Sequence, residues 1–255
     1  MNTELEDARA EIARLRQQLV QAGQALEDFT YSVSHDLRAS LRHVSAYLTV
    51  VREDLGDGID AAIASHLDTA SEAAAQMARL MDGLLELSRV GRAELQLCDV
   101  DLARLISDVR YQLEPDTAQR RIEWRVALAL PIVRGDMALL GLVLRHLLAN
   151  AVKFTRPREQ ATIDIDWSHS DGRCELRIRD NGVGFDPRQQ DRLFRVFQRL
   201  HNPRQFEGLG IGLALARRVV ERHGGTIAAR GEVAGETAAG CEISLTLPLA
   251  DGAAG

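Results

Sequence analysis

One string of residues in the first part of this sequence has the composition of a nucleophilic site. In Ser34-His35-Asp36-Leu37-Arg38, an imidazole is followed directly by a carboxylate and, three residues on, by a guanidinium. An imidazole is largely neutral and nucleophilic near pH 7, and an adjacent carboxylate can orient it and accept its proton. A lone surface histidine is usually inert, so the prediction of a nucleophilic site depends on the carboxylate and the guanidinium beside His35. His35, Asp36 and Arg38 are the candidate catalytic residues.

Glycine-bearing motifs form a second candidate site, after residue 150. Asp180-Asn181-Gly182-Val183-Gly184-Phe185 follows an expected strand, which would hold the Asp180 carboxylate at the strand end while Gly182 and Gly184 let a ligand approach the backbone. A plain β-turn is the alternative interpretation of this motif. Gly208-Leu209-Gly210-Ile211-Gly212-Leu213 opens an expected helix, whose N-terminal amides and dipole suit phosphate. Neither a dinucleotide fingerprint nor a P-loop is present.

Asn150 and Lys153 add a metal ligand and a cation to this site. They lie three residues apart near the end of an expected helix, and therefore on one helical face. A carboxamide oxygen is a suitable ligand for Mg²⁺, and an ammonium group can reach phosphate. Asn150 is the candidate metal ligand.

Long amphipathic helices are expected to position His35. Spacings alternate between three and four along Leu5, Ala8, Ile12, Leu15, Leu19, Ala22, Leu26, Phe29 and Val33. This is a coiled-coil seam, which needs a partner, most simply a second copy of the chain. Two steps of four, to Leu37 and Leu41, then shift the seam around His35, which projects away from it.

The pattern stops at Gly56-Asp57-Gly58, where Asp60 can cap a second helix that ends near Gly91. Two antiparallel helices cannot enclose a core alone, whereas two copies make a four-helix bundle, so we expect a homodimer.

The rest of the chain alternates elements of both kinds. Helical patterns run over 101–114, 136–153, 188–198 and 210–223, and strand-like alternation occurs around Ile122, Ile163, Cys174 and Ile243. All six prolines lie after residue 114, which separates two differently built halves. We therefore expect a helical part followed by an α/β domain.

Composition excludes several classes of protein. A net charge of -6 argues against a general nucleic-acid binder. No run of 18 or more apolar residues occurs and the N-terminus is acidic, so we expect no membrane insertion, no signal peptide and a cytoplasmic location. The three cysteines follow no metal-ligand spacing and are expected to be free thiols.

Taken in order, the motifs resemble those of two-component sensor histidine kinases. The segment FTYSVSHDLRASLR is similar to the H-box of the phytochrome-like members, and NAVKFT, DNGVGF, LFRVFQRL and GLGIGL resemble their N, G1, F and G2 boxes. The resemblance implies a coiled-coil signalling helix (1–28), a dimerisation and histidine phosphotransfer hairpin (29–92), an α/β-sandwich ATP-binding domain of the Bergerat type (93–250) and a flexible tail (251–255).

The resemblance also implies a role for each candidate residue. His35 would be phosphorylated by ATP, with Asp36 as orienting base, and would pass the phosphoryl group to an aspartate of a response-regulator receiver. Asp180 would accept a hydrogen bond from adenine, and Asn150 would bind Mg²⁺. Phosphate contacts would come from Lys153, Arg199, Gly208, Gly210, Gly212 and Leu213. Residues 199–209 would form a lid, with Phe194 and Phe197 packing it against the domain.

The sequence departs from the family pattern at several positions. Leu142 and His146 replace two polar residues of the N-box, which removes oxygen ligands near the metal. Ser40 replaces a proline, which predicts a straighter first helix. Ala39 replaces the Thr or Asn of bifunctional members, which predicts weak phosphatase activity toward the phosphorylated partner.

Two alternatives to a kinase stay open at this point. Leu142 and His146 favour a catalytically weak ATP-binding scaffold that docks or sequesters a response regulator. A conformational ATPase of the gyrase or Hsp90 kind would not explain the string around His35. With about 90 residues of helix and about 150 of ATP domain assigned, we expect the signal to arrive through the coiled coil or from a separate sensor protein.

Overall fold

The computed structural model describes residues 2–202, 205–232 and 240–250, and divides the chain into two compact units, 1–89 and 90–255. The tail expected at 251–255 lies outside the described residues. The first unit consists of helix α1 (Asn2–Leu55), a 3-10 turn (Gly56–Gly58) and most of helix α2 (Ala61–Arg92). The expected turn is confirmed, because the Asp60 carboxylate accepts a hydrogen bond from the Ala62 N–H at 2.8 Å.

Helix α1 is continuous through His35. Ser40, in place of proline, keeps its backbone N–H and points its hydroxyl to the Asp36 carbonyl at 3.3 Å. An ion pair between Arg38 and Asp82 and another between Arg52 and Asp68 join α1 to α2.

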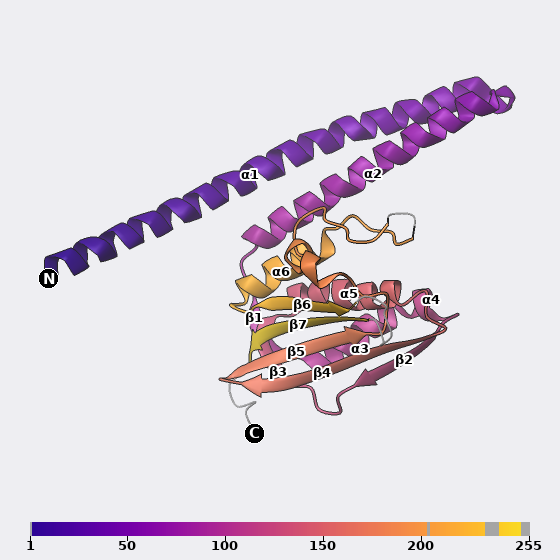
Figure 1. The fold of residues 1–255 in the computed structure, drawn as a ribbon. Helices are drawn as coiled ribbons and strands as arrows, with labels where there is room; N and C mark the ends of the chain where they lie inside the picture. Colours follow the sequence, from indigo (N-terminus) through magenta and orange to yellow (C-terminus); the bar gives the residue numbers. More distant parts are fainter. Residues whose placement is uncertain (1, 203–204, 233–239, 251–255) are drawn as a thin grey trace. The chain divides into compact units, whose positions relative to one another are not determined.

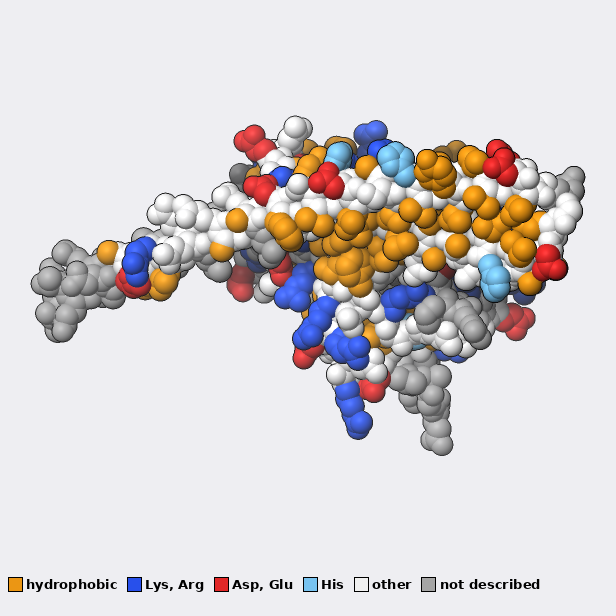
Figure 2. Space-filling view, turned by 90° about the horizontal axis from the view of Figure 1, so that it is seen from above, with side chains coloured by type: hydrophobic (Ala, Val, Ile, Leu, Met, Phe, Trp, Pro, Cys, Tyr) orange, Lys and Arg blue, Asp and Glu red, His pale blue; other side chains and the backbone are white. Residues whose placement is uncertain are grey.

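The expected apolar seam of α1 lies open in the single chain. Phe29 is 66% exposed, Val44 48% and Val51 42%, whereas the neighbouring Ser34 is buried. Figure 2 shows hydrophobic side chains gathered in a strip along the hairpin. The side chains of Leu5, Ala8, Leu19 and Leu26 lie outside the described part of the chain. The hairpin therefore presents an unpartnered apolar strip.

The second unit is a two-layer α/β structure (Figure 1). Its main sheet has the order β2-β4-β5-β7-β6, in which β2 and β4 are parallel and the other pairs are antiparallel. The strands are β2 (Arg121–Val126), β4 (Gln160–Ser170), β5 (Arg173–Asp180), β6 (Ile227–Glu232) and β7 (Gly240–Pro248). A second, two-stranded antiparallel sheet pairs β1 (Leu97–Asp101) with β3 (Ile132–Asp136).

Helices cover one face of the main sheet. They are α3 (Leu102–Gln112), the short α4 (Glu114–Thr117), α5 (Met137–Phe154) and α6 (Gly212–Arg222). Alternation along β4 sends Ala161, Ile163 and Ile165 into the core against them. The α/β architecture expected from the sequence is confirmed, although β1, β3 and β6 were not among the expected strands.

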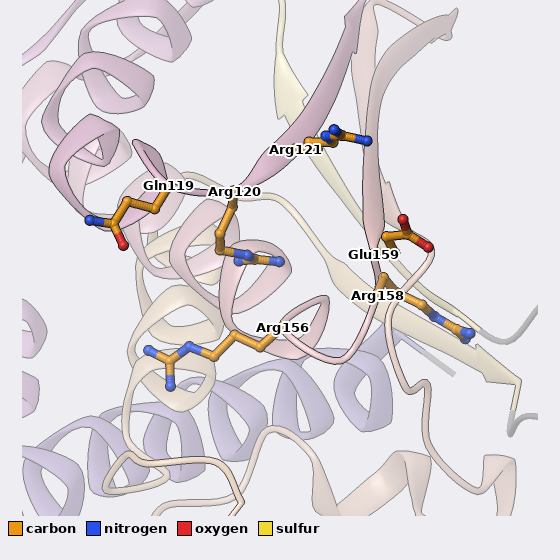
Figure 3. Close-up of a pocket in the computed structure, with 6 residues that line it drawn as sticks. All are labelled: Gln119, Arg120, Arg121, Arg156, Arg158 and Glu159. Carbon is orange, nitrogen blue, oxygen red and sulfur yellow. The ribbon is translucent and has the colours of Figure 1, made fainter.

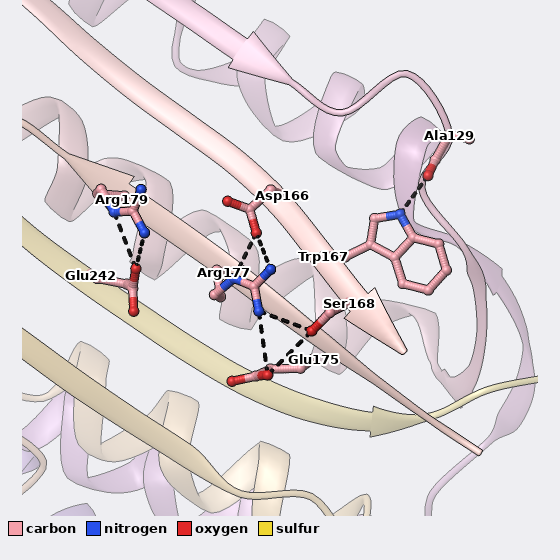
Figure 4. A network of polar contacts seen from close by, with 8 residues as sticks. All are labelled: Ala129, Asp166, Trp167, Ser168, Glu175, Arg177, Arg179 and Glu242. Atoms are coloured by element: carbon pink, nitrogen blue, oxygen red, sulfur yellow. Dashed lines mark hydrogen bonds and ion pairs between the residues drawn. The ribbon is translucent and has the colours of Figure 1, made fainter. Parts of the chain in front are cut away.

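The opposite face of the sheet is polar (Figure 4). Arg177 on β5 binds Asp166 on β4 at 2.6 Å and Ser168 at 2.9 Å, and Arg179 pairs with Glu242 on β7. Cross-strand pairs of opposite charge stabilise adjacent strands modestly. This face is therefore a charged surface.

The prediction of a helix over 188–198 is wrong in part. A 3-10 helix runs from Pro187 to Arg192, and turns replace helix after it. Phe197 has a φ of 63°, a left-handed conformation that a right-handed helix cannot include.

Helix α5 is, among the described residues, the one helix long and apolar enough to cross a membrane. Leu144, Leu147 and Leu148 are among its side chains that are buried within the second unit, whereas Met137 at its start is 55% exposed. A core helix passes the same length and composition test, so its apolarity has a sufficient explanation in packing.

Candidate nucleotide-binding site and phosphotransfer histidine

His35 lies exposed on α1 with its ring oriented by neighbours. Its Nδ1 is 3.2 Å from Asp36 Oδ1, and its ring lies 6.5 Å from that of Tyr31, one turn earlier, at an interplanar angle of 22°. A hydrogen bond from Nδ1–H to the carboxylate leaves the lone pair on Nε2, which faces away from Asp36. This is the geometry that a histidine nucleophile requires.

Asp180 is the last residue of β5 and is 7% exposed. Burial raises the pKa of its carboxyl to about 7, although hydrogen bonds from the Gly182 and Cys241 backbone oppose the shift. The Gly182 N–H donates to Asp180 Oδ1 at 2.8 Å. A buried acceptor at a strand end is suited to select the edge of a ligand ring.

The loop after β5 packs closely against other backbone. Gly184 has a φ of 62°, and a Cβ there would lie 1.7 Å from the Glu232 carbonyl oxygen, so only glycine fits. The Val183 N–H donates to the Phe154 carbonyl at 3.2 Å. This bond joins the Asp180 loop to the end of α5.

Helix α5 carries two candidate site residues, Asn150 and Lys153, near its C-terminal end. Asn150 and Lys153 are half-buried, and the Asn150 amide makes no hydrogen bond to any other described residue. Burial lowers the pKa of Lys153, and the nearby Arg156 and Arg199 lower it further. Lys153 Nζ lies 4.5 Å from the Phe154 ring centre. A cation held among other cations favours an anionic ligand.

His146 stands one turn before Asn150, against the start of α6. A Cβ on Gly212 would lie 2.9 Å from His146 Nδ1, and His146 Nε2 is buried without a hydrogen-bond partner in the described structure. Burial lowers the pKa of His146, which keeps the imidazole neutral. His146 Nδ1 therefore faces Gly212, the first residue of α6.

The residues before α6 fold as a lid over the end of α5. Gly208 and Gly210 have positive φ values of 137° and 71°, and Gly212 and Leu213 open α6. Arg199 donates to the Phe206 carbonyl, within the lid itself. The structure thus brings Lys153, Arg199 and the glycine loop together.

An aromatic cluster that sequence reasoning missed holds the lid. The ring centres of Phe154, His201 and Phe206 lie 5.0 to 5.4 Å from one another. Phe206 is buried, whereas Phe194 is half-buried and Phe197 is 42% exposed, so the lid packs on α5 through Phe206, and packing by Phe194 and Phe197 stays a prediction. An aromatic residue directly after Lys153 and another near the end of the lid were the available signal.

A buried polar contact holds α5 and α6 together at their other ends. His223, after α6, accepts a hydrogen bond at Nε2 from the Asp136 N–H at 2.9 Å, and its Nδ1 donates to the Val219 carbonyl at 2.8 Å. Burial opposes ionisation of Asp136, but backbone N–H donors from Leu139, Gln96 and Ala138 lower its pKa overall. Asp136 thereby caps α5 and fixes the helix that carries Asn150.

The donor set can hold Mg²⁺ in one restricted way. No group of three or more His, Cys, Asp or Glu side chains suited to a metal occurs among the described residues. Mg²⁺ usually takes one or two protein oxygens and completes its shell with water and substrate phosphates. A single free carboxamide, Asn150, fits this pattern, so Asn150 would hold the ion while the phosphates and water supply the remaining oxygens.

Fold and site together define a domain with the Bergerat ATPase fold, and the comparisons agree. Residues 135–251 match the family described as "Histidine kinase-, DNA gyrase B-, and HSP90-like ATPase". "Cyanobacterial phytochrome B" of Nostoc is 34% identical over 85% of this chain, and "Methanogenesis regulatory histidine kinase FilI" of Methanothrix harundinacea is 32% identical over 88%. This chain spans 29% and 24% of those two relatives.

Solved structures give the same result. Full-length ShkA in complex with AMPPNP is 27% identical, with a TM-score of 0.63 over 89% of this chain and 47% of that one. The mycobacterial sensor histidine kinase MprB is 26% identical, with a TM-score of 0.52 over 60% of this chain and 98% of that one. The chain belongs to the sensor histidine kinase family, with an N-terminal helical region and a histidine-kinase ATPase domain.

Proposed function

We propose that this chain phosphorylates itself on His35 from ATP and passes the phosphoryl group to an aspartate of a response-regulator receiver. The observation that carries the proposal is the exposed His35, oriented by Asp36 at 3.2 Å, on the same chain as a histidine-kinase ATPase domain. The bound nucleotide in the ShkA structure supports ATP as the substrate.

The proposed step is an in-line phosphoryl transfer. His35 Nε2 attacks the γ-phosphorus of ATP, an N–P bond forms, and the bond from that phosphorus to the β,γ-bridging oxygen breaks, so ADP leaves with the electron pair. The Nδ1 proton passes to Asp36. The metal supplies charge stabilisation when bound; in this chain, Lys153 and Arg199 would contribute positive charge beside the phosphates. Arg38, paired with Asp82, would hold α1 against α2.

The adenine end of the pocket would be read by Asp180. Its acceptor oxygen suits the exocyclic amino group of adenine, and Gly182 and Gly184 allow the close backbone packing that holds the Asp180 loop in place. The lid glycines, Gly208 and Gly210, and the first turn of α6 at Gly212 and Leu213 would surround the phosphates, as helix N-termini commonly do.

The domain limits and partners are part of the proposal. We place a coiled-coil helix at 1–28, the dimerisation and phosphotransfer hairpin at 29–92 and the catalytic domain at 93–250. The open apolar strip supports a homodimer, and the receiver and a separate sensor protein are the proposed partners, without nucleic acid or membrane insertion and in the cytoplasm. Ala39 supports weak phosphatase activity.

Radiolabelling tests the proposal directly. With γ-labelled ATP, the wild type should acquire an acid-labile, base-stable label that is lost in His35→Gln. The Asp180→Asn variant should also lose the label because it loses ATP, while its oligomeric state stays unchanged.

A scaffold is the second candidate, because Leu142 and His146 remove oxygen donors near Asn150. ATP binding without any label in the wild type would support the scaffold and reject the kinase. Label that persists in His35→Gln would reject His35 as the acceptor.

A further inference from the structure

Four arginines of the second unit surround a hollow of about 430 Å³, lined by Gln119, Arg120, Arg121, Arg156, Arg158 and Glu159. They come from two segments, the turn that leads into β2 together with its first residue, Arg121, and the loop between α5 and β4. The parallel pairing of the two strands, with Arg121 opposite Gln160, brings these segments together. In Figure 3, Arg120 lies on the segment that leads into β2, and Arg156 and Arg158 lie on the neighbouring loop between α5 and β4.

The cluster concentrates positive charge on an acidic chain. Four guanidinium groups and one carboxylate line the hollow, although the whole chain carries a net charge of -6. Burial lowers the pKa of Arg120, and repulsion from Arg156 lowers it further. Like charges held this close are unfavourable unless an anion joins them.

Two of the arginines are anchored by neutral groups. Arg120 donates to the Val152 carbonyl at 2.6 Å and to Thr155 Oγ1 at 3.1 Å, and Arg158 donates to the carbonyls of Asn181 at 2.7 Å and Gly182 at 3.0 Å. These bonds cap α5 and fasten the Asp180 loop, so both side chains have a structural role. Carbonyl acceptors orient a guanidinium but leave its positive charge in place.

The other two arginines have no such structural role. Arg121 is exposed, with no side-chain hydrogen bond or ion pair to the described residues. Arg156 pairs with Glu207 of the lid at 2.6 Å, and both side chains are about half exposed or more. Exposed ion pairs of this kind are weak and exchange readily. Helix capping and loop fastening therefore do not account for the whole cluster.

We propose that this hollow is a binding site for a small oxyanion of the phosphate class with two or more negative charges, distinct from the nucleotide site. Arg120 and Arg158 provide a fixed positive field, and Arg121 and Arg156 supply guanidinium donors that match phosphate oxygens. Binding draws Arg156 away from Glu207. Occupancy of the hollow thereby weakens one attachment of the lid to the end of α5.

Pyrophosphate titration by calorimetry is the test, with the full chain saturated by AMPPNP and the ionic strength held constant with chloride. The wild type should still bind pyrophosphate when AMPPNP fills the nucleotide site, and orthophosphate should bind at least tenfold more weakly. The Arg121→Gln, Arg156→Gln double variant should lose at least tenfold in pyrophosphate affinity. Arg217→Gln, an exposed α6 arginine paired with Glu221, is the matched control and should bind as the wild type does.

Glu207→Gln tests the exchange, since removal of the competing carboxylate should tighten pyrophosphate binding at least threefold. Loss of pyrophosphate binding on AMPPNP saturation would assign the anion to the nucleotide site alone and overturn the proposal. Unchanged affinity in the double variant, with circular dichroism showing a folded chain, would overturn it as well. Unchanged affinity in Glu207→Gln would overturn the link to the lid.

Discussion

Asp180 is a buried carboxyl group whose surroundings oppose its ionisation. Burial raises its pKa to about 7. Between the ordinary pKa of an Asp carboxyl and pH 7, Asp180 is therefore protonated in the folded chain and ionised in the unfolded chain. This contribution to stability is complete below the ordinary value and is lost as the pH rises through about 7. Above this pH the ionised Asp180, the residue suited to contact adenine, therefore lowers the free energy of unfolding of the second unit.

The pH dependence of unfolding should reveal this cost. Between pH 5 and pH 8 the Asp180 carboxyl should lower the unfolding free energy of the second unit by about 2–3 kcal/mol, from roughly two pH units at ~1.4 kcal/mol each. Asp180→Asn should remove that loss. Urea titrations followed by the fluorescence of Trp124 and Trp167, both in the second unit, measure it.

The exposed carboxylate of Asp108 on α3 provides the control, because Asp108→Asn should leave the difference between the two pH values unchanged. An equal loss of stability in the wild type and Asp180→Asn would show that the carboxyl does not titrate near pH 7.

His146 should limit metal-dependent nucleotide binding. In His146→Asn an amide oxygen replaces a nitrogen that is buried without a partner, and Mg²⁺ prefers oxygen. The affinity for AMPPNP with Mg²⁺ should rise roughly tenfold, the scale of a change close to a metal ligand. Calorimetry with Mg²⁺ and with EDTA separates the effects. An equal rise in EDTA would assign the gain to relief of the unpaired nitrogen.

At the scale of elements, α5 links core and site. One side of the helix packs Leu140, Leu144 and Leu148 into the second unit, and the other side carries Asn150 and Lys153. Asp136 at its start and Arg120 at its end satisfy terminal backbone groups. The helix can therefore hold charged side chains at the pocket without fraying.

Leu148→Ala should test how far the second unit depends on this helix. Leu148 is 0% exposed, and truncation of such a leucine costs about 2–5 kcal/mol through lost burial and the cavity left behind. Tryptophan fluorescence in urea measures the change. Leu128→Ala removes the same atoms from a fully exposed side chain and should cost less than about 0.5 kcal/mol. Equal losses in the two variants would contradict the burial of α5.

At the scale of the whole molecule, the two units differ in how they bury apolar surface. The second unit encloses its own core between sheet and helices. The hairpin leaves a strip of apolar side chains open, and the proposed second copy would bury this strip and stabilise the helical pair.

Sedimentation should show this dependence. The wild type should sediment as a dimer, and Val44→Asp should raise the dimer dissociation constant at least 100-fold, because symmetry places the buried charge in the interface twice. His43→Asp puts the same charge at an exposed neighbouring position and should leave the dimer intact. A monomeric wild type, or a dimer that Val44→Asp does not weaken, would contradict the assignment of the strip.

Local patterns in the sequence determined much of this protein. Periodicity predicts both long helices, and the turn at Gly56 and the cap at Asp60 follow from residue chemistry that acts within a few positions. The motifs around His35, Asp180 and Gly210 indicate the family, because each is a short string whose function depends on neighbouring residues.

Only the tertiary structure decided what depends on residues distant in the chain. The pairing of β2 with β4 brings Arg121 near Arg156, and the packing of the lid places Phe206 and His201 on Phe154. The pKa of Asp180 depends on burial and on a backbone hydrogen bond from Cys241, which lies about 60 residues later in the chain. No spacing rule predicts such contacts, because their free energy arises from strand register and packing that exist only after the chain has folded.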